Sequence, residues 1–138
     1  MMLEPFTWHL RFSVDAYTAL ATAELEAEKM HLGEVGTESL LLVLLEQSGI
    51  ALSRAREEVE KMVKTFPYVP EGGLQLSRRM CRILFCLASA SVQHREGSRD
   101  IEVNDLWREL LNDYESVAQQ VLMNCNVDID AFRKRLGV

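Results

Sequence analysis

The sequence has no apolar run long enough to cross a bilayer. A membrane-spanning helix needs about 20 consecutive apolar residues, whereas the run LLLVLL at residues 40–45 has only six. The N-terminal stretch MMLEPFTWHLRF also lacks the basic region and following apolar core that a secretory signal requires. We therefore expect no membrane partner and a cytoplasmic location.

The chain is also poor in cysteine and in positive charge. Its three cysteines, Cys81, Cys86 and Cys125, follow neither a CxxC nor a zinc-ligand spacing, so we expect buried free thiols. No metal and no cofactor is predicted. The net charge is −6 and no long run of Lys or Arg occurs, which argues against nucleic acid as a partner.

The composition is that of one folded domain. Of the 138 residues, 48% are hydrophobic and 26% are charged, values close to those of globular proteins. At this length the expectation is a single domain over residues 1–138. The run at residues 40–45 is rich in leucine, a strong helix former, and contains one β-branched residue, Val43. It is therefore predicted to be a short helix that is buried on all sides, and not a strand.

A first helical repeat is predicted over residues 12–65. Ser13 is a good N-cap, and the mostly alanine stripe behind it recurs at helical spacing, which lets a partner helix approach closely. This helix is predicted to end near Gly33, with His31 in its last turn.

The rest of the first repeat contains two shorter helices. Thr37 is predicted to cap the Leu-rich helix, with Glu38 in its first turn, where a carboxylate favours the positive end of the helix dipole. A further helix is expected at about residues 52–64, with Glu58 on its solvent-facing side.

The second half of the chain repeats the first. The segment FPYVPEGG, residues 66–73, is predicted to be a linker, and a second helical stripe follows Ser77 in repeat two, residues 74–138. IEVNDLWRELL then matches VGTESLLLVLL, with Trp107 in the column of Leu41. Helices are also expected at about residues 117–123 and after Asp128.

Such a duplication favours two helical units stacked about a pseudo-twofold axis. Neither unit buries its apolar face alone, so the two Leu-rich helices are predicted to meet near that axis. The predicted fold class is all-α, a pseudo-twofold duplication of a helical repeat.

These motifs resemble the Clp N-terminal repeat domain, which stands at the front of Clp-type AAA+ unfoldases and also occurs alone in accessory proteins. The resemblance rests on Ser13, on Glu38 in GTESLLLVLL, and on ESVAQQVL with NVDIDAFRKRL. It implies a non-catalytic module that docks substrates or adaptors for a Clp unfoldase and its protease, or regulates that unfoldase. The motor's GxxxxGK[ST] loop does not occur in this sequence. The implied partners are Clp unfoldase subunits, adaptor proteins or unfolding substrates.

The Clp C type, which this pattern resembles most, reads arginine-phosphorylated clients. It uses a hydroxyl residue at the start of each repeat and a Glu at the start of each short helix. Ser13 and Glu38 match this pattern in the first repeat. In the second repeat Ser77 remains, but Asn104 occupies the Glu column and carries no charge. Glu38 is therefore open to two interpretations, a helix-dipole residue and part of a phosphoarginine pocket.

Other side chains also have two interpretations. The cluster of Arg78, Arg79 and Arg82 is either a solvated face or a dock for an acidic adaptor. Phe12 and Phe85 are predicted to pack in the core. Three further aromatic residues are candidates for a docking groove or for plain surface positions: Trp8, Phe66 and Tyr68.

Two other function classes were weighed. An enzyme would need a nucleophile with a positioned base, or paired acids in an apolar pocket; the sequence has no elbow motif and its histidines are scattered. The second alternative is a helical dimeric regulator that binds DNA or another protein, unrelated to proteolysis. Its most basic stretch, LSRRMCRILF, is too apolar for a DNA recognition helix.

Overall fold

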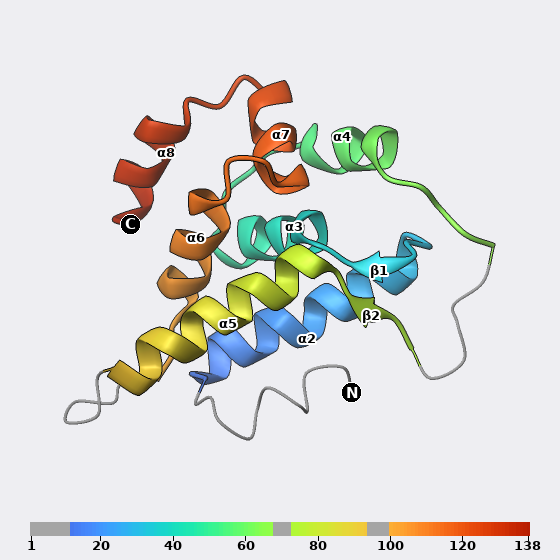
Figure 1. Cartoon of the computed structure of the whole chain (residues 1–138). Coiled ribbons are helices and arrows are strands. Elements are labelled where there is room, and N and C mark those ends of the chain that lie inside the picture. Colours follow the sequence, from blue (N-terminus) through green and yellow to red (C-terminus); the bar gives the residue numbers. More distant parts are fainter. Residues whose placement is uncertain (1–11, 68–72, 94–99) are drawn as a thin grey trace.

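The structure, a computed structural model, describes residues 12–67, 73–93 and 100–138. Within these residues the chain is mostly helical, with one small sheet (Figure 1), which confirms the predicted fold class. In chain order the elements are α2 (Val14–Lys29), β1 (Glu34–Val35), α3 (Thr37–Gln47), α4 (Ala55–Met62), β2 (Gln75–Leu76), α5 (Arg78–Gln93), α6 (Val103–Asn112), α7 (Val117–Asn124) and α8 (Ile129–Leu136). None of the described helices is both long enough and apolar enough to pass through a bilayer.

Helix α3 is the centre of the core. Every residue of the run at 40–45 is buried, which confirms the prediction. The reason is that α3 contacts α2, α4, α6 and α7, so neighbours cover it on all sides. Four alanines of α2 are fully buried, and α2 makes the most extensive contact with α3. Their small side chains permit that close approach.

The start and end of the first two helices differ in detail from the prediction. Helix α2 ends at Lys29, earlier than predicted, because His31 adopts a left-handed conformation (φ 57°) that closes the helix. The Leu32 N–H then bonds back to the Ala27 carbonyl, 3.0 Å away. Thr37 does not cap its own helix, whose N-cap is Gly36. Its hydroxyl instead accepts the Ala118 N–H at the start of α7 (3.2 Å).

Helix α4 is shorter than predicted, and the prediction that Glu58 faces the solvent is wrong. Glu58 is only 6% exposed, although it was placed on the solvent side. It is covered because α7 packs across α4. The Asn124 amide of α7 donates to Glu58 Oε2 (3.3 Å), and Arg54 and Lys61 lie beside Oε1.

The second repeat follows the prediction closely. Ser77 caps α5, Glu102 is the N-cap of α6 and forms a capping box with Asp105, and α7 and α8 occupy the predicted segments. Trp107 of α6 is fully buried and, like Leu41, points into the core. Helix α3 contacts α6, as expected for the two Leu-rich helices near the axis.

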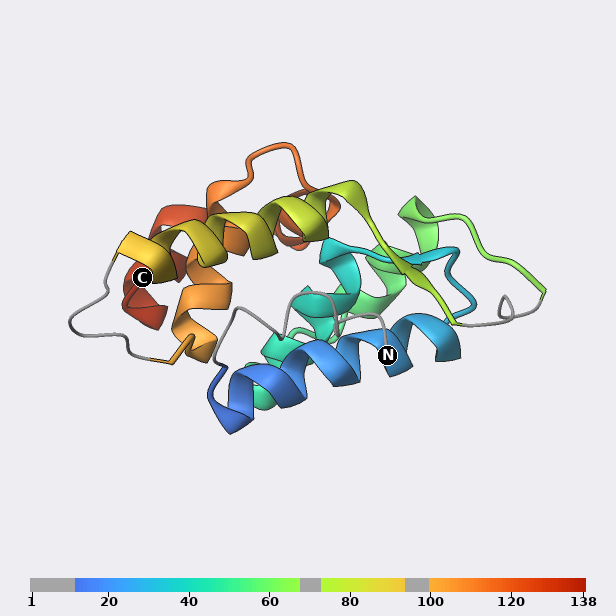
Figure 2. The same cartoon turned by 60° about the horizontal axis from the view of Figure 1, so that its bottom comes forward.

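The two repeats are joined by reciprocal backbone pairing, which the sequence did not predict. Val35 of repeat one pairs in parallel with Leu76 of repeat two, and Ile101 of repeat two forms a parallel bridge with Phe12 of repeat one. Figures 1 and 2 show α2 and α5 running in opposite directions, so the two pairings lie at opposite ends of these helices. Each repeat therefore contributes the same two kinds of segment to the two junctions. The boundary at 66–73 stays a prediction, since residues 68–72 lie outside the described chain.

Candidate docking site at the repeat junctions

Each junction is built from the start of a long helix. The Ser13 hydroxyl accepts the Ala16 N–H and the Ser77 hydroxyl accepts the Met80 N–H, both at 3.1 Å. These bonds satisfy free N–H groups in the first turns of α2 and α5. Ser77 is buried, whereas Ser13 is half-buried. Both hydroxyls thus serve first as helix caps.

Backbone hydrogen bonds connect each of these serines to the other repeat. The Ser77 N–H donates to the Val35 carbonyl and the Ser13 N–H donates to the Ile101 carbonyl, each at 2.9 Å. Glu38 follows Val35 by one turn and so belongs to the Ser77 junction. Asn104 follows Ile101 and belongs to the Ser13 junction. The structure thus separates Ser13 from Glu38, which the sequence motif had grouped.

Glu38 is held in an unusual place for a carboxylate. Its side chain is 6% exposed. Burial raises the pKa of Glu38, a backbone N–H bond opposes this rise, and the charge of Glu34 adds to it. The carboxylate folds back against Gly36, where an added Cβ would collide with it. Glycine at this position therefore makes room for Glu38.

A cavity of about 320 Å³ opens beside this carboxylate. It is formed by the turn after α2, by β1 and by the segment after α4, and its lining includes Leu32, Glu34, Glu38, Val63, Lys64 and Phe66. The Lys64 ammonium lies 5.4 Å from the centre of the Phe66 ring. The cavity therefore combines two carboxylates, one cation and an aromatic face, groups that suit a guanidinium or another cationic head.

The equivalent position of the second repeat has a different chemistry. Asn104 is exposed and uncharged, and the start of α6 is closed by the Glu102–Asp105 capping box. The Glu102 N–H donates to Asp105 Oδ2 (2.9 Å). The two junctions share a backbone frame, and each holds a buried carboxylate. Asp105 of the second is committed to the capping box and to Arg108 (2.9 Å), whereas Glu38 of the first lines a cavity.

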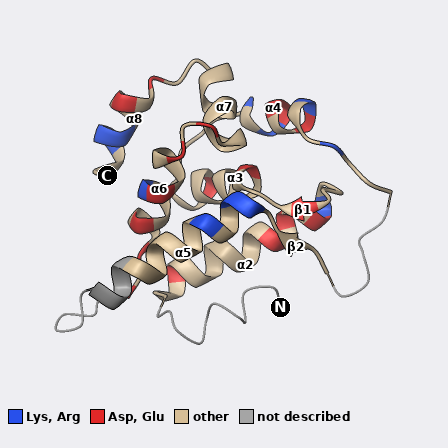
Figure 3. Ribbon diagram, viewed as in Figure 1, with Lys and Arg blue, Asp and Glu red and all other residues tan. Residues whose placement is uncertain are grey.

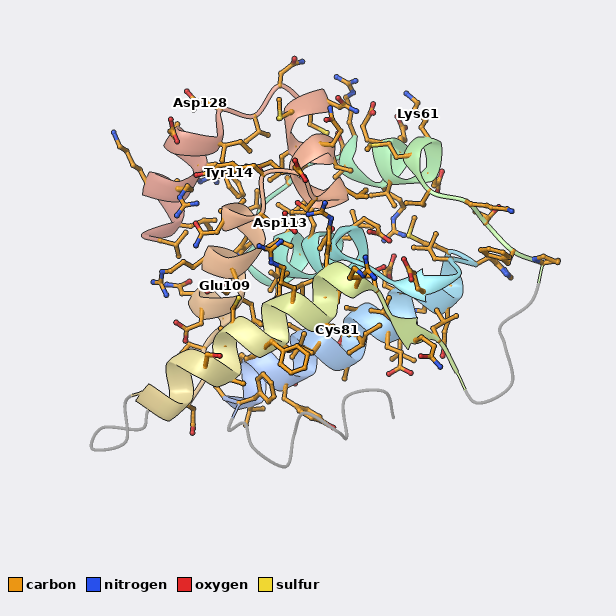
Figure 4. All side chains as sticks on the ribbon, viewed as in Figure 1. Lys61, Cys81, Glu109, Asp113, Tyr114 and Asp128 are labelled. Carbon is orange, nitrogen blue, oxygen red and sulfur yellow. The ribbon has the colours of Figure 1, made fainter. Side chains whose placement is uncertain are left out.

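The basic cluster of α5 is not uniformly solvated. Arg79 pairs with Asp113 and Glu115 of the α6–α7 connection, so the solvated-face interpretation is wrong for this residue. Figure 4 shows Asp113 on that connection. Arg78, next to Ser77, is exposed and makes no ion pair with another residue that the structure describes.

Two core assignments were also wrong. Phe85 is 63% exposed on α5, although it was predicted to pack. Phe12 is partly buried against the core, as predicted, while Trp8 and Tyr68 lie outside the described residues. All three cysteines are free, but none is buried as predicted: Cys81 and Cys125 are half-buried and Cys86 is exposed. Within residues 12–67, 73–93 and 100–138, no group of three or more potential metal-binding side chains occurs.

Sequence reasoning missed the contacts made between repeats. The acceptor role of Thr37 toward α7 and the burial of Glu58 depend on residues 81 and 66 positions further along the chain. Arg54 pairs with Glu58 one helical turn away, but this local spacing gives no sign that α7 covers Glu58.

Comparison with known proteins finds a likeness among solved structures. No protein-family model matches the sequence, and no curated protein matches it. Among solved structures, the Hsp104 N-terminal domain from Candida albicans matches with a TM-score of 0.67 over 91% of this chain and 89% of that chain. The chain has a Clp N-terminal-like fold. At 11% identity the likeness shows the fold alone.

Proposed function

We propose that this chain is a non-catalytic docking module that brings substrates or adaptors to a Clp unfoldase, or regulates that unfoldase. The observation that carries the proposal is the structural match to the Hsp104 N-terminal domain, which spans nearly the whole of both chains. The sequence resemblance, which rests on Ser13 and the GTESLLLVLL and NVDIDAFRKRL motifs, points the same way.

The proposed docking points are the two repeat junctions. The first offers the Glu38 cavity and the start of α5, where Ser77 bonds to Val35 and Arg78 is exposed. The second offers Ser13 and Asn104. Because only Glu38 of the two buried carboxylates, Glu38 and Asp105, lines a described cavity, we expect the two junctions to bind different ligands. The Glu38 cavity is proposed to bind the guanidinium group of a substrate protein, in particular that of a phosphoarginine. Glu38 would form an ion pair with this group.

Binding to an unfoldase tests the docking role. The labelled chain is titrated with a Clp AAA+ hexamer, and fluorescence anisotropy and the ATPase rate are measured. We expect saturable binding and a changed ATPase rate. Contacts of this kind are typically weak singly and become effective when a hexamer presents several sites. No binding to any Clp hexamer tested, with binding instead to random DNA at low salt, would favour the regulator alternative.

A second experiment tests the Glu38 cavity alone. Isothermal titration calorimetry compares phosphoarginine, arginine and inorganic phosphate, and Glu38→Gln is expected to weaken phosphoarginine binding by about tenfold or more. Asn104→Ala, at the equivalent position of repeat two, is the matched control and should bind as the parent does. Absence of phosphoarginine binding in the parent removes this assignment and leaves the docking role to the hexamer experiment.

A further inference from the structure

An apolar groove that shares no lining residue with the Glu38 cavity lies between the α3–α4 connection and α8. Its volume is about 270 Å³, and its wall includes Ile50, Leu52, Val127, Ala131, Phe132 and Arg135. These residues come from the α3–α4 connection, from the α7–α8 connection and from α8. Figure 4 marks Asp128, at the point where the chain enters α8 on one rim of this groove.

Two helix ends of the same kind fix the walls. Gly49 (φ 68°) lies in the turn after α3 and Asn126 (φ 62°) lies in the turn after α7, both in the left-handed region. In each case the next residue bonds back into the helix, Ile50 N to the Leu45 carbonyl (2.9 Å) and Val127 N to the Leu122 carbonyl (3.0 Å). This closure turns an apolar side chain back toward the helix. The walls are therefore held by backbone hydrogen bonds.

The floor of the groove is continuous with the core. Phe132 is 7% exposed and meets Trp107 edge-on, with ring centres 5.4 Å apart. The Trp107 indole N–H donates to Ser48 Oγ (3.2 Å), just before the turn at Gly49. A ligand seated on Phe132 would change the surroundings of Trp107, which makes its fluorescence a direct reporter.

The charges on the two rims are unequal. Asp128 is committed to capping α8, because its Oδ1 accepts the Ala131 N–H (3.2 Å). At the other end Arg135 lines the groove and makes no ion pair with any residue in the described part of the chain. Arg133 and Lys134 precede it, so the last turn of α8 is basic although the whole chain carries −6. Figure 3 shows this positive turn at the outer end of α8.

We propose that this groove docks a short segment of a partner protein in which an apolar side chain is followed by carboxylates. The apolar side chain lies over Phe132 between Ile50 and Val127, and a carboxylate pairs with Arg135. Charge complementarity decides the occupant, because an apolar groove beside an unpaired arginine favours an acidic segment over a basic one. The inference rests on the proposed docking role but uses a surface separate from the Glu38 cavity.

The test uses the full chain with Trp8→Phe, which leaves Trp107 as the reporter, since the sequence has two tryptophans. Three capped peptides are titrated: GSLDEG, its lysine counterpart GSLKKG, and GSSDEG, which lacks the apolar side chain. We expect GSLDEG to shift the Trp107 emission and to bind at least about tenfold more tightly than the other two. Equal binding of all three, or no change up to about 1 mM peptide, would overturn the proposal.

Two variants separate the charge from the apolar contact. Arg135→Glu should lower the affinity for GSLDEG about tenfold and favour GSLKKG instead. Ala131→Phe should fill the groove and abolish binding of both while the charge stays. Lys29→Glu, a charge reversal at an exposed position of α2, is the matched control and should bind as the parent does. Binding of GSLDEG to Arg135→Glu with parental affinity contradicts the assignment, whatever the Clp hexamer and phosphoarginine experiments show.

Discussion

The two repeats use one backbone plan for different chemistry. At each junction a serine N–H bonds to the carbonyl just before a short helix of the other repeat, with the same 2.9 Å geometry. The helix that follows begins with a buried Glu38 in repeat one and with an exposed Asn104 in repeat two. The difference teaches that the pairing depends on the backbone and tolerates side-chain change, whereas the binding chemistry depends on single side chains.

The largest loss of stability is expected at the equivalent positions Leu41 of repeat one and Trp107 of repeat two, both of which are fully buried. Trp107→Ala should lower the free energy of unfolding by about 3–5 kcal/mol, because it removes the contact with Phe132 and leaves a large cavity. Leu41→Ala should cost about 2–4 kcal/mol. Urea unfolding followed by far-UV circular dichroism measures both. A smaller loss for Trp107→Ala than for Leu41→Ala would show that repeat one alone holds the core.

A smaller loss of stability is expected at Thr37, for which the equivalent residue Val103 of repeat two provides the control. Thr37→Val keeps the shape but leaves the buried Ala118 N–H without an acceptor, which should cost about 1–3 kcal/mol. Val103→Thr, at the half-buried equivalent position, is the reciprocal control and should change stability by less than about 0.5 kcal/mol. Similar losses for the two variants would argue that the bond to α7 contributes nothing specific to repeat one.

The smallest effect is a pH dependence carried by Glu38. Burial raises the pKa of this carboxyl in the folded chain above the ordinary 4.5, so the fold binds the proton more tightly than the unfolded chain does. The stabilising contribution of the protonated carboxyl is present below pH 4.5 and is lost as the pH rises through the folded pKa. Glu38→Gln should therefore be more stable than the parent at pH 7, and the difference should shrink on acidification.

Urea unfolding at several pH values measures this difference. Asn104→Glu, which places a carboxyl at the exposed equivalent position, is the control and should show little pH dependence. If Glu38→Gln tracks the parent at every pH, the carboxyl is solvated and the contrast between the junctions is lost.

Much of the fold followed from local patterns, while the site did not. The alanine stripe behind Ser13, the leucines of α3 and the repeat of their spacing in α6 predicted helices that the structure confirms. The solvent-facing position predicted for Glu58 was wrong. Its neighbours in the sequence are charged, and no local pattern indicates that α7 covers it. The prediction for Phe85 was wrong in the opposite sense: this aromatic residue was expected to pack in the core, but it is exposed.

The sequence by itself determined which segments are helical and that they recur, because the period of apolar residues and the capping serines act over one or two turns. Only the tertiary structure decided which repeat each junction joins, since parallel pairing of Val35 with Leu76 and of Phe12 with Ile101 brings together segments dozens of residues apart. The groove at Phe132 likewise joins residues of the α3–α4 connection to residues of α8, which are far apart in the sequence. Backbone pairing at such a distance leaves no periodic mark in the sequence.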